Sequence, residues 1–168
     1  MTENERLLGD LLQAHGAAVY RYCRSVSRRD DADDLFQETM LAALGGPPLV
    51  TVTSPRAWLF TIARHAAIRL GRKRAGEPER LEPLLELGQE AGWGRTDPET
   101  DAIASQDRHS LQRALEDLNA ADREVVLLRD IEELSVRETA AIMETTEAAV
   151  RTRLHRARLR LMKRMRAK

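Results

Sequence analysis

Residues 135–165, SVRETAAIMETTEAAVRTRLHRARLRLMKRM, decide how the C-terminal part of the chain is expected to fold. Ser135 and Glu138 have the spacing of a capping box, in which each side chain bonds the backbone N–H of the other residue at a helix start. A short helix is therefore predicted from residue 136 to about residue 143. Glu-Thr-Thr at residues 144–146 predicts a turn, and either threonine can cap the next helix.

A second helix is predicted after this turn, apolar on one side and rich in arginine on the other. Its apolar residues recur at helical steps of three and four, and they are Val150, Leu154, Ala157, Leu161 and Met165. Two helices joined by a short turn, with a basic second helix, have the geometry of a helix-turn-helix that enters the major groove of DNA. An ordinary helical hairpin with a solvated arginine face gives the same pattern, so both readings stay open here.

The composition indicates a helical protein that can bury a core. The chain has 168 residues, of which 42% are hydrophobic, 32% are charged and only 4% are aromatic. Abundant Leu, Ala, Arg and Glu favour short packed helices over a β-sandwich. Cys23 is the single cysteine, so an internal disulfide is excluded, and we expect it in the core of its helix. No apolar run has membrane-spanning length, so we expect a cytoplasmic chain without membrane insertion.

The net charge of zero hides a pattern along the chain. Residues 1–74 carry 11 basic and 8 acidic side chains, and residues 125–168 carry 11 basic and 6 acidic ones. Residues 75–124 carry 5 basic and 13 acidic side chains, a net charge of −8. Two basic ends are typical of a protein that touches a polyanion at two places, although basic helices can also be merely solvated.

The N-terminal third is expected to be helical with one irregular loop. A helix is predicted from about Ala32, and the Gly-Gly-Pro-Pro start of residues 45–55 excludes an α-helix there. Ser54 then has the character of an N-cap, with Pro55 in the first helical position. The apolar side of this later helix is predicted to contain Trp58, Leu59, Ile62, Ala66 and Leu70.

The middle of the chain has the composition of a linker. Residues 76–106 are acidic and interrupted by Gly and Pro, with room for one helical turn around Leu84 and Leu85. The predicted fold is therefore all-α: two small helical domains, 1–75 and 107–168, joined by a flexible acidic linker, 76–106. The C-terminal domain is predicted to be the helix-turn-helix.

Three stretches in this order resemble the extracytoplasmic-function sigma factors of bacterial RNA polymerase. They are DADDLFQETMLAAL at 31–44, PRAWLFTIARHAAIRLGRKR at 55–74, and the segment at 115–161 that contains the helix-turn-helix. The resemblance implies that the first domain binds core RNA polymerase and opens promoter DNA at the minus-ten element. It implies that the second domain reads the minus-thirty-five element, and that an anti-sigma factor controls the chain.

The resemblance assigns polymerase binding to the helix at 31–44. The residues that match the family pattern there are Asp33, Asp34, Leu35, Gln37 and Glu38. A helix with an apolar stripe of Leu35, Met40 and Leu44 can pack against its own domain while it presents carboxylates to a basic partner. Acids at a helix start also complement the helix dipole, which explains the aspartates without any partner.

The resemblance assigns minus-ten recognition to the loop and helix that follow. The loop can supply Thr51, Thr53 and Ser54 to an unstacked base, and the helix can supply positive charge to the strand. The helix residues predicted to contact DNA are Arg64, His65, Arg69, Arg72, Lys73 and Arg74. Many family members have Asn at the position of His65. Trp58 is expected in the core rather than stacked on a base.

The resemblance assigns minus-thirty-five recognition to the arginine-rich helix. Its predicted DNA-contacting residues are Glu147, Arg151, Thr152, Arg153, His155 and Arg156. Arginines there can neutralise phosphates or clasp guanine edges. Glu147 can accept from a cytosine amino group, or it can simply complement the helix N-terminus. The −8 linker is expected to lie along a positively charged nucleic-acid channel of the polymerase.

The sequence offers no pattern that supports catalysis. The histidines and Cys23 lack metal-ligand spacing, and no phosphate-binding glycine loop or catalytic triad order is present. We therefore expect no metal, no cofactor and no enzymatic activity. Two other functions stay open: a helix-turn-helix regulator that binds DNA alone, which explains only residues 107–168, and a sigma-mimicking protein that binds a partner without needing the basic helices.

Overall fold

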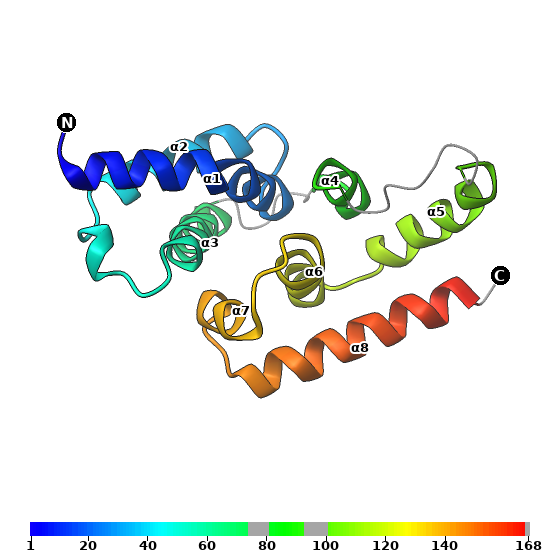
Figure 1. The fold of residues 1–168 in the computed structure, drawn as a ribbon. Coiled ribbons are helices and arrows are strands. Elements are labelled where there is room, and N and C mark those ends of the chain that lie inside the picture. Colours follow the sequence, from blue (N-terminus) through cyan, green and yellow to red (C-terminus); the bar gives the residue numbers. More distant parts are fainter. Residues whose placement is uncertain (74–80, 93–100, 167–168) are drawn as a thin grey trace. The chain divides into compact units, whose positions relative to one another are not determined.

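A computed structural model describes residues 1–73, 81–92 and 101–166 (Figure 1). The regular elements in these ranges are helices, which confirms the predicted all-α class, and an isolated β-bridge joins Arg28 and Leu81. The chain forms two compact units, Met1–Leu81 with Ala141–Glu144 and Glu82–Ala140 with Thr145–Lys168. Within the described ranges, every helix is too short or too polar to cross a membrane.

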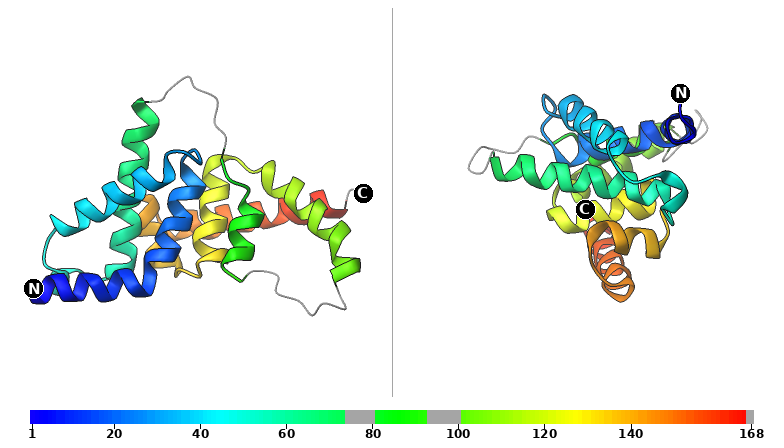
Figure 2. Two further views of the ribbon diagram at one scale, coloured as in Figure 1. Left: turned by 90° about the horizontal axis from the view of Figure 1, so that it is seen from above. Right: turned by 90° about the vertical axis from the view of Figure 1, so that its left-hand side faces the viewer.

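The first unit is built on three helices that pack against one another. These are α1 (Glu3–Val26), α2 (Ala32–Leu44) and α3 (Pro55–Lys73), and each contacts the other two (Figure 2). The α2 helix begins at the predicted residue. The buried side chains of the unit include Leu8, Val19, Tyr22, Cys23, Leu35, Leu59, Phe60 and Ala63. Cys23 therefore lies in the core, as predicted.

Local signals start and separate these helices. Thr2 and Glu5 form a capping box on α1, with side-chain to backbone distances of 3.1 and 2.7 Å. Ser54 caps α3: its carbonyl accepts from the N–H of Trp58 at 2.9 Å, and Pro55 is the first helical residue, as predicted. Between α2 and α3 the chain makes a single 3₁₀ turn, η1 (Leu49–Thr51).

One glycine in this connection is required by a close approach. A Cβ atom at Gly46 would lie 2.7 Å from Cζ2 of the Trp58 ring, closer than carbon atoms pack. The Trp58 side chain packs against this glycine but is only half-buried, so it lies at the edge of the core in which it was predicted. Leu49 is 6% exposed, and its N–H donates to Asn4 Oδ1 at 2.7 Å. The loop is thus attached to the body of the unit at both places.

The second unit is assembled around the C-terminal helix. Four side chains of α8 (Glu147–Arg166) are buried, namely Val150, Leu154, Ala157 and Leu161. They form the predicted apolar stripe, whose last member, Met165, is only half-buried. The α8 helix packs against α5 (Asp101–Glu116) and α6 (Ala120–Val126). A π-helical turn, η3 (Leu127–Ile131), continues α6 and contributes three buried side chains to the unit.

The predicted helix-turn-helix is present in the structure. Ser135 and Glu138 make both bonds of the capping box, at 3.0 and 3.1 Å, and α7 runs over Val136–Met143. The Thr146 hydroxyl accepts from the N–H of Ala149 at 3.0 Å, so Thr146 is the threonine that caps α8. The turn between the helices passes through Glu144, whose φ of 54° is left-handed.

A segment of the predicted linker is folded. The sequence allowed one helical turn there, but α4 (Leu84–Glu90) is longer, and Leu84, Leu85 and Leu87 are 1%, 7% and 0% exposed. The α4 helix packs against α5 and η3. Arg123 of α6 donates to the backbone carbonyl of Glu82, and burial lowers the pKa of its guanidinium. Residues 82–90 are therefore part of the second unit.

Truncation of a buried α4 leucine tests this assignment. Leu87→Ala should lower the free energy of unfolding by about 2–5 kcal/mol, because it leaves a cavity in a closed core. Leu159→Ala is the matched control, since Leu159 is 46% exposed and its loss should cost less than about 0.5 kcal/mol. Urea unfolding followed by circular dichroism measures both variants, and equal effects would contradict the assignment.

The buried thiol gives a second test of the fold. Burial raises the pKa of Cys23 to about 12, which leaves the thiol protonated in the folded chain. At a pH of about 8, near the ordinary thiol pKa of about 8.5, iodoacetamide should modify Cys23 only as fast as the first unit opens. Mass spectrometry should show prompt modification in concentrated guanidinium chloride. Prompt modification of the native chain would place Cys23 at the surface.

Candidate nucleic-acid and partner-binding interfaces

The outer face of α2 carries the predicted acidic cluster. Asp33, Asp34, Gln37 and Glu38 are all exposed on this helix. Leu35, which the sequence groups with them, is 1% exposed and packs α2 against its own unit. Leu35 therefore positions the helix and does not face solvent in this structure.

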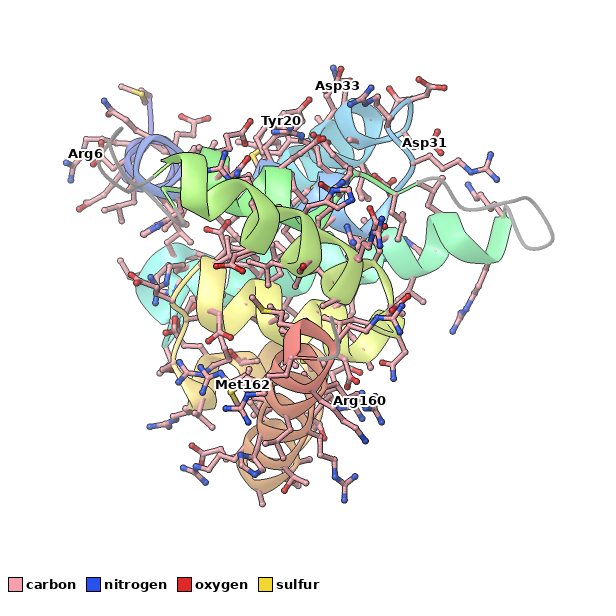
Figure 3. The ribbon with its side chains drawn as sticks, turned by 90° about the vertical axis from the view of Figure 1, so that its right-hand side faces the viewer. Arg6, Tyr20, Asp31, Asp33, Arg160 and Met162 are labelled. Atoms are coloured by element: carbon pink, nitrogen blue, oxygen red, sulfur yellow. The ribbon has the colours of Figure 1, made fainter. Side chains whose placement is uncertain are left out.

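Two of the four exposed residues already have partners inside the unit. The Tyr20 hydroxyl of α1 donates to Asp33 Oδ1, and Figure 3 shows the two side chains together. Tyr20 also meets Phe36 edge-on, at 5.4 Å between ring centroids. Arg69 of α3 pairs with Glu38 at 3.1 Å. Within the described residues no ion pair holds Asp34, so its carboxylate is the one in the cluster that has no partner in its own unit.

Leu41 and Leu44 extend this face. Leu41 was not predicted to belong to it, and Leu44 was assigned to the core. Leu44 was predicted to pack inside its domain, but it is 57% exposed, so that prediction is wrong. Leu41 is 69% exposed. Asp34, Gln37, Leu41 and Leu44 follow steps of three and four, so they share one side of α2. This regular spacing is the signal that could have identified the surface, which is acidic at its start and apolar at its end.

Of the three predicted hydroxyls in the loop before α3, that of Thr53 makes no hydrogen bond within the described residues. Thr51 is exposed, and its hydroxyl donates to the carbonyl of Pro48 at 2.7 Å. Ser54 Oγ accepts from the N–H of Ala57 at 3.4 Å as part of the α3 cap. Thr53 lies between them at a bend and is exposed. The loop thus uses two of its three predicted hydroxyls to hold its own conformation.

The exposed side of α3 is basic. His65, Arg69, Arg72 and Lys73 are exposed, and Arg64 is half-buried. Arg74 lies outside the described residues. Arg69 is shared between the two predicted sites, because its partner Glu38 belongs to the acidic face of α2. Phe60 is fully buried with its ring edge-on to Tyr22 at 5.7 Å, so it belongs to the core and not to a stacking surface.

The arginines of α8 divide into two groups along the helix. In the first half, the predicted residues Glu147, Arg151, Thr152, Arg153, His155 and Arg156 are all exposed. In the described part of the chain, no ion pair involves any arginine of this half. In the second half, Arg158 pairs with Asp130, Arg160 with Asp122 at 2.7 Å, and Arg164 with Asp117 at 2.8 Å. The hydrogen bond to Asp130 raises the pKa of Arg158.

A hollow of about 470 Å³ lies beside the first half of α8. Arginines from successive turns of α8 line it, together with Asn119 and Asp122 from the start of α6. The complete lining is Asn119, Asp122, Ala148, Ala149, Thr152, Arg153, Arg156 and Arg160. With three guanidinium groups and one carboxylate, this surface favours an anion.

Comparison with known proteins identifies both units. Residues 11–77 match the family described as Sigma-70 region 2, and residues 108–161 match Sigma-70 region 4. The chain is 31% identical over 161 residues to RNA polymerase sigma factor YlaC of Bacillus subtilis, covering 93% of this chain and 90% of that protein. It is 35% identical over 162 residues to ECF RNA polymerase sigma factor SigD of Mycobacterium tuberculosis, covering 92% and 74%.

Solved structures of sigma factors have a similar fold. CnrH, in complex with the cytosolic domain of CnrY, matches with a TM-score of 0.63 and 26% identity over 99% of this chain and 92% of that one. The sigma factor RpoE of Bartonella quintana, in complex with the anti-sigma factor NepR, also has a TM-score of 0.63, with 25% identity over 98% and 97%. The order of regions, the identities and the coverage agree, and the chain belongs to the extracytoplasmic-function sigma factors of bacterial RNA polymerase.

Proposed function

We propose that this sigma factor binds core RNA polymerase through α2, engages the minus-ten element with the η1 loop and α3, and engages the minus-thirty-five element with α8. We assign residues 1–75 to polymerase binding and promoter opening and residues 107–168 to duplex recognition. Residues 76–106 connect the two, although 82–90 within them pack with the second unit. The observation that carries the proposal is the division of α8, in which the arginines of the predicted DNA face are exposed and unpaired within the described residues.

The polymerase interface follows from the chemistry of α2. Asp34 and Gln37 lie on one side of the helix with Leu41 and Leu44, and all four are exposed. Exposed leucines next to a carboxylate favour a partner helix that is basic at one end and apolar at the other. The buried Leu35 and the pairing of Glu38 with Arg69 hold this side of α2 in place. We therefore place Leu41 and Leu44 in the polymerase interface with Asp34 and Gln37.

The minus-ten interface follows from the loop and the basic side of α3. Thr53 has an exposed hydroxyl for an unstacked base, and the exposed Arg72 and Lys73 can hold the phosphates of the strand. His65 is also exposed, but its Nε2 already pairs with Glu144 Oε1 at 2.5 Å. Thr51 and Ser54 form hydrogen bonds within the loop. We therefore propose that they maintain the shape of the base-binding loop and do not contact the base.

The minus-thirty-five interface follows from α8 and its cap. The Thr146 cap and the buried stripe fix the rotation of the helix, which directs Arg151, Arg153 and Arg156 outward. Arginine at such positions binds phosphates or the acceptor edge of guanine. Glu147 lies in the first turn, where its carboxylate complements the helix N-terminus.

Regulation and location complete the proposal. The two similar solved structures are complexes with CnrY and with the anti-sigma factor NepR, and on that basis we infer that an anti-sigma factor holds this chain inactive. The chain would act in the cytoplasm, where the polymerase is, and it would direct initiation while the polymerase performs the chemistry.

The first test is binding to core RNA polymerase. Asp34→Arg should abolish co-elution of the chain with core polymerase on a sizing column, because it reverses the charge of the accessible carboxylate on α2. Leu41→Ser should weaken co-elution strongly while leaving the melting temperature nearly unchanged, because Leu41 is 69% exposed.

Asp10→Arg is the matched control for these variants, since Asp10 is an exposed acid on α1. It should co-elute as the wild type does. If the wild type fails to bind core polymerase but still binds duplex DNA, a regulator that acts alone becomes the correct function. Binding to polymerase without any binding to DNA would favour the sigma-mimicking protein.

The second test concerns the DNA face of α8. Arg151→Ala should lower promoter affinity by about 1–3 kcal/mol, which is roughly 5- to 150-fold, if this arginine contacts a base. Arg164→Ala is the control, because Arg164 already pairs with Asp117 at 2.8 Å. Fluorescence anisotropy with labelled promoter duplex measures both variants, and an equal loss in the two would refute the assignment of Arg151.

A further inference from the structure

The hollow beside α8 contains a carboxylate, which is unexpected on a surface that binds the phosphates of DNA. Asp122 lines this hollow together with Arg153, Arg156 and Arg160. Phosphate groups are anions, so a carboxylate at this place opposes their approach. An acid near the start of a helix complements the helix dipole, but that effect does not explain why this one lies among the arginines.

The position of Asp122 is closely determined by its neighbours. Its side chain is 8% exposed, and Asn119 accepts from its backbone N–H at 2.8 Å as the cap of α6. One oxygen, Oδ2, accepts from Arg160 Nη1 at 2.7 Å. Arg160 itself is 61% exposed, so its guanidinium is anchored at one end and open to solvent at the other. Figure 3 shows Arg160 and Met162 on opposite sides of α8.

The same pattern occurs at two further places along α8. Asp130 holds Arg158 through two bonds, one of them at 3.2 Å from Nε to Oδ2, and Asp117 holds Arg164. Of the three acids, only Asp122 lines the hollow with the exposed arginines of the first half. It is therefore the acid best placed to influence DNA binding.

We propose that Asp122 is a specificity-determining residue of the DNA interface: it occupies Arg160 as an internal counter-ion, so that α8 meets DNA phosphates with Arg151, Arg153 and Arg156 alone. This inference rests on the proposed function of α8. The pair lowers by one the number of protein cations that can contact phosphates, and it does so for a duplex of any sequence. Non-specific binding falls as a result, and base contacts keep a larger share of the total affinity.

The salt dependence of DNA binding measures the number of phosphate contacts directly. Each phosphate contact releases condensed counter-ions, so the slope of log K against log[salt] changes by about 0.9 for each arginine gained or lost. Asp122→Asn keeps the shape of the side chain but removes its charge. It should steepen the slope by about 0.9 and raise affinity for non-promoter duplex more than for promoter duplex.

The experiment compares four variants of the full chain with the wild type, using fluorescence anisotropy on promoter and non-promoter duplexes over a salt series. Asp122→Asn should steepen the slope, and the double variant Asp122→Asn/Arg160→Gln should return it to the wild-type value. Arg160→Gln alone removes no phosphate contact but leaves the Asp122 carboxylate unpaired, so it should flatten the slope less than Arg156→Gln, which should flatten it by about 0.9.

The variants separate failure of this inference from failure of the proposed function. If Arg160→Gln flattens the slope as much as Arg156→Gln does, Arg160 contacts DNA in the wild type and the inference is wrong. If Asp122→Asn folds, by its circular dichroism, but has the wild-type slope, the inference is also wrong. If Asp122→Asn does not fold, the comparison of Arg160→Gln with Arg156→Gln still decides. If neither the wild type nor Arg156→Gln shows salt-dependent binding, the DNA function of α8 itself is refuted.

Discussion

Burial of one apolar stripe of α8 is the contact on which the C-terminal unit depends. Val150, Leu154, Ala157 and Leu161 can enter the core only at one rotation of the helix, and that rotation determines the direction of every basic side chain. Asp130 of η3, Asp122 of α6 and Asp117 of the turn before α6 then pair with arginines of the second half of α8, whereas the arginines of its first half have no ion pair within the described residues. Charge pairing in this unit thus depends on hydrophobic burial, because burial of the stripe sets the positions of the arginines.

Carboxylates have opposite roles in the two units, and their neighbours decide which role each has. On α2, Asp34 lies exposed without an ion pair in the described part of the chain, beside leucines that are also exposed. In the second unit, Asp122 is almost completely buried and paired with Arg160. A net charge near zero therefore conceals an acidic surface in one unit and a neutralised set of acids in the other.

The sequence predicts those features that depend on neighbours along the chain. The starts of α2 and α3, the capping box at Ser135 and the stripe of α8 all follow from spacings of a few residues. The ion pairs do not, because Asp130 and Arg158 are 28 residues apart, and Asp122 and Arg160 are 38 apart. Only one turn of α4 was predicted, because Gly, Pro and acid residues surround leucines that are helical only when another helix covers them. Leu44 was misassigned because periodicity identifies a face but not which face is covered.

The close approach of Gly46 to Trp58 has a consequence for the energetics of promoter opening. Because the indole ring lies where any Cβ at position 46 would be, the loop before α3 is held against the helix that follows it. Leu49 and Asn4 hold the same loop against α1. The free-energy cost of ordering this loop is therefore part of folding and is not added when a base binds. Under the proposed function, the binding energy of the captured strand is then left to offset the cost of unstacking the duplex, and a single methyl group at Gly46 would divert part of it to ordering the protein.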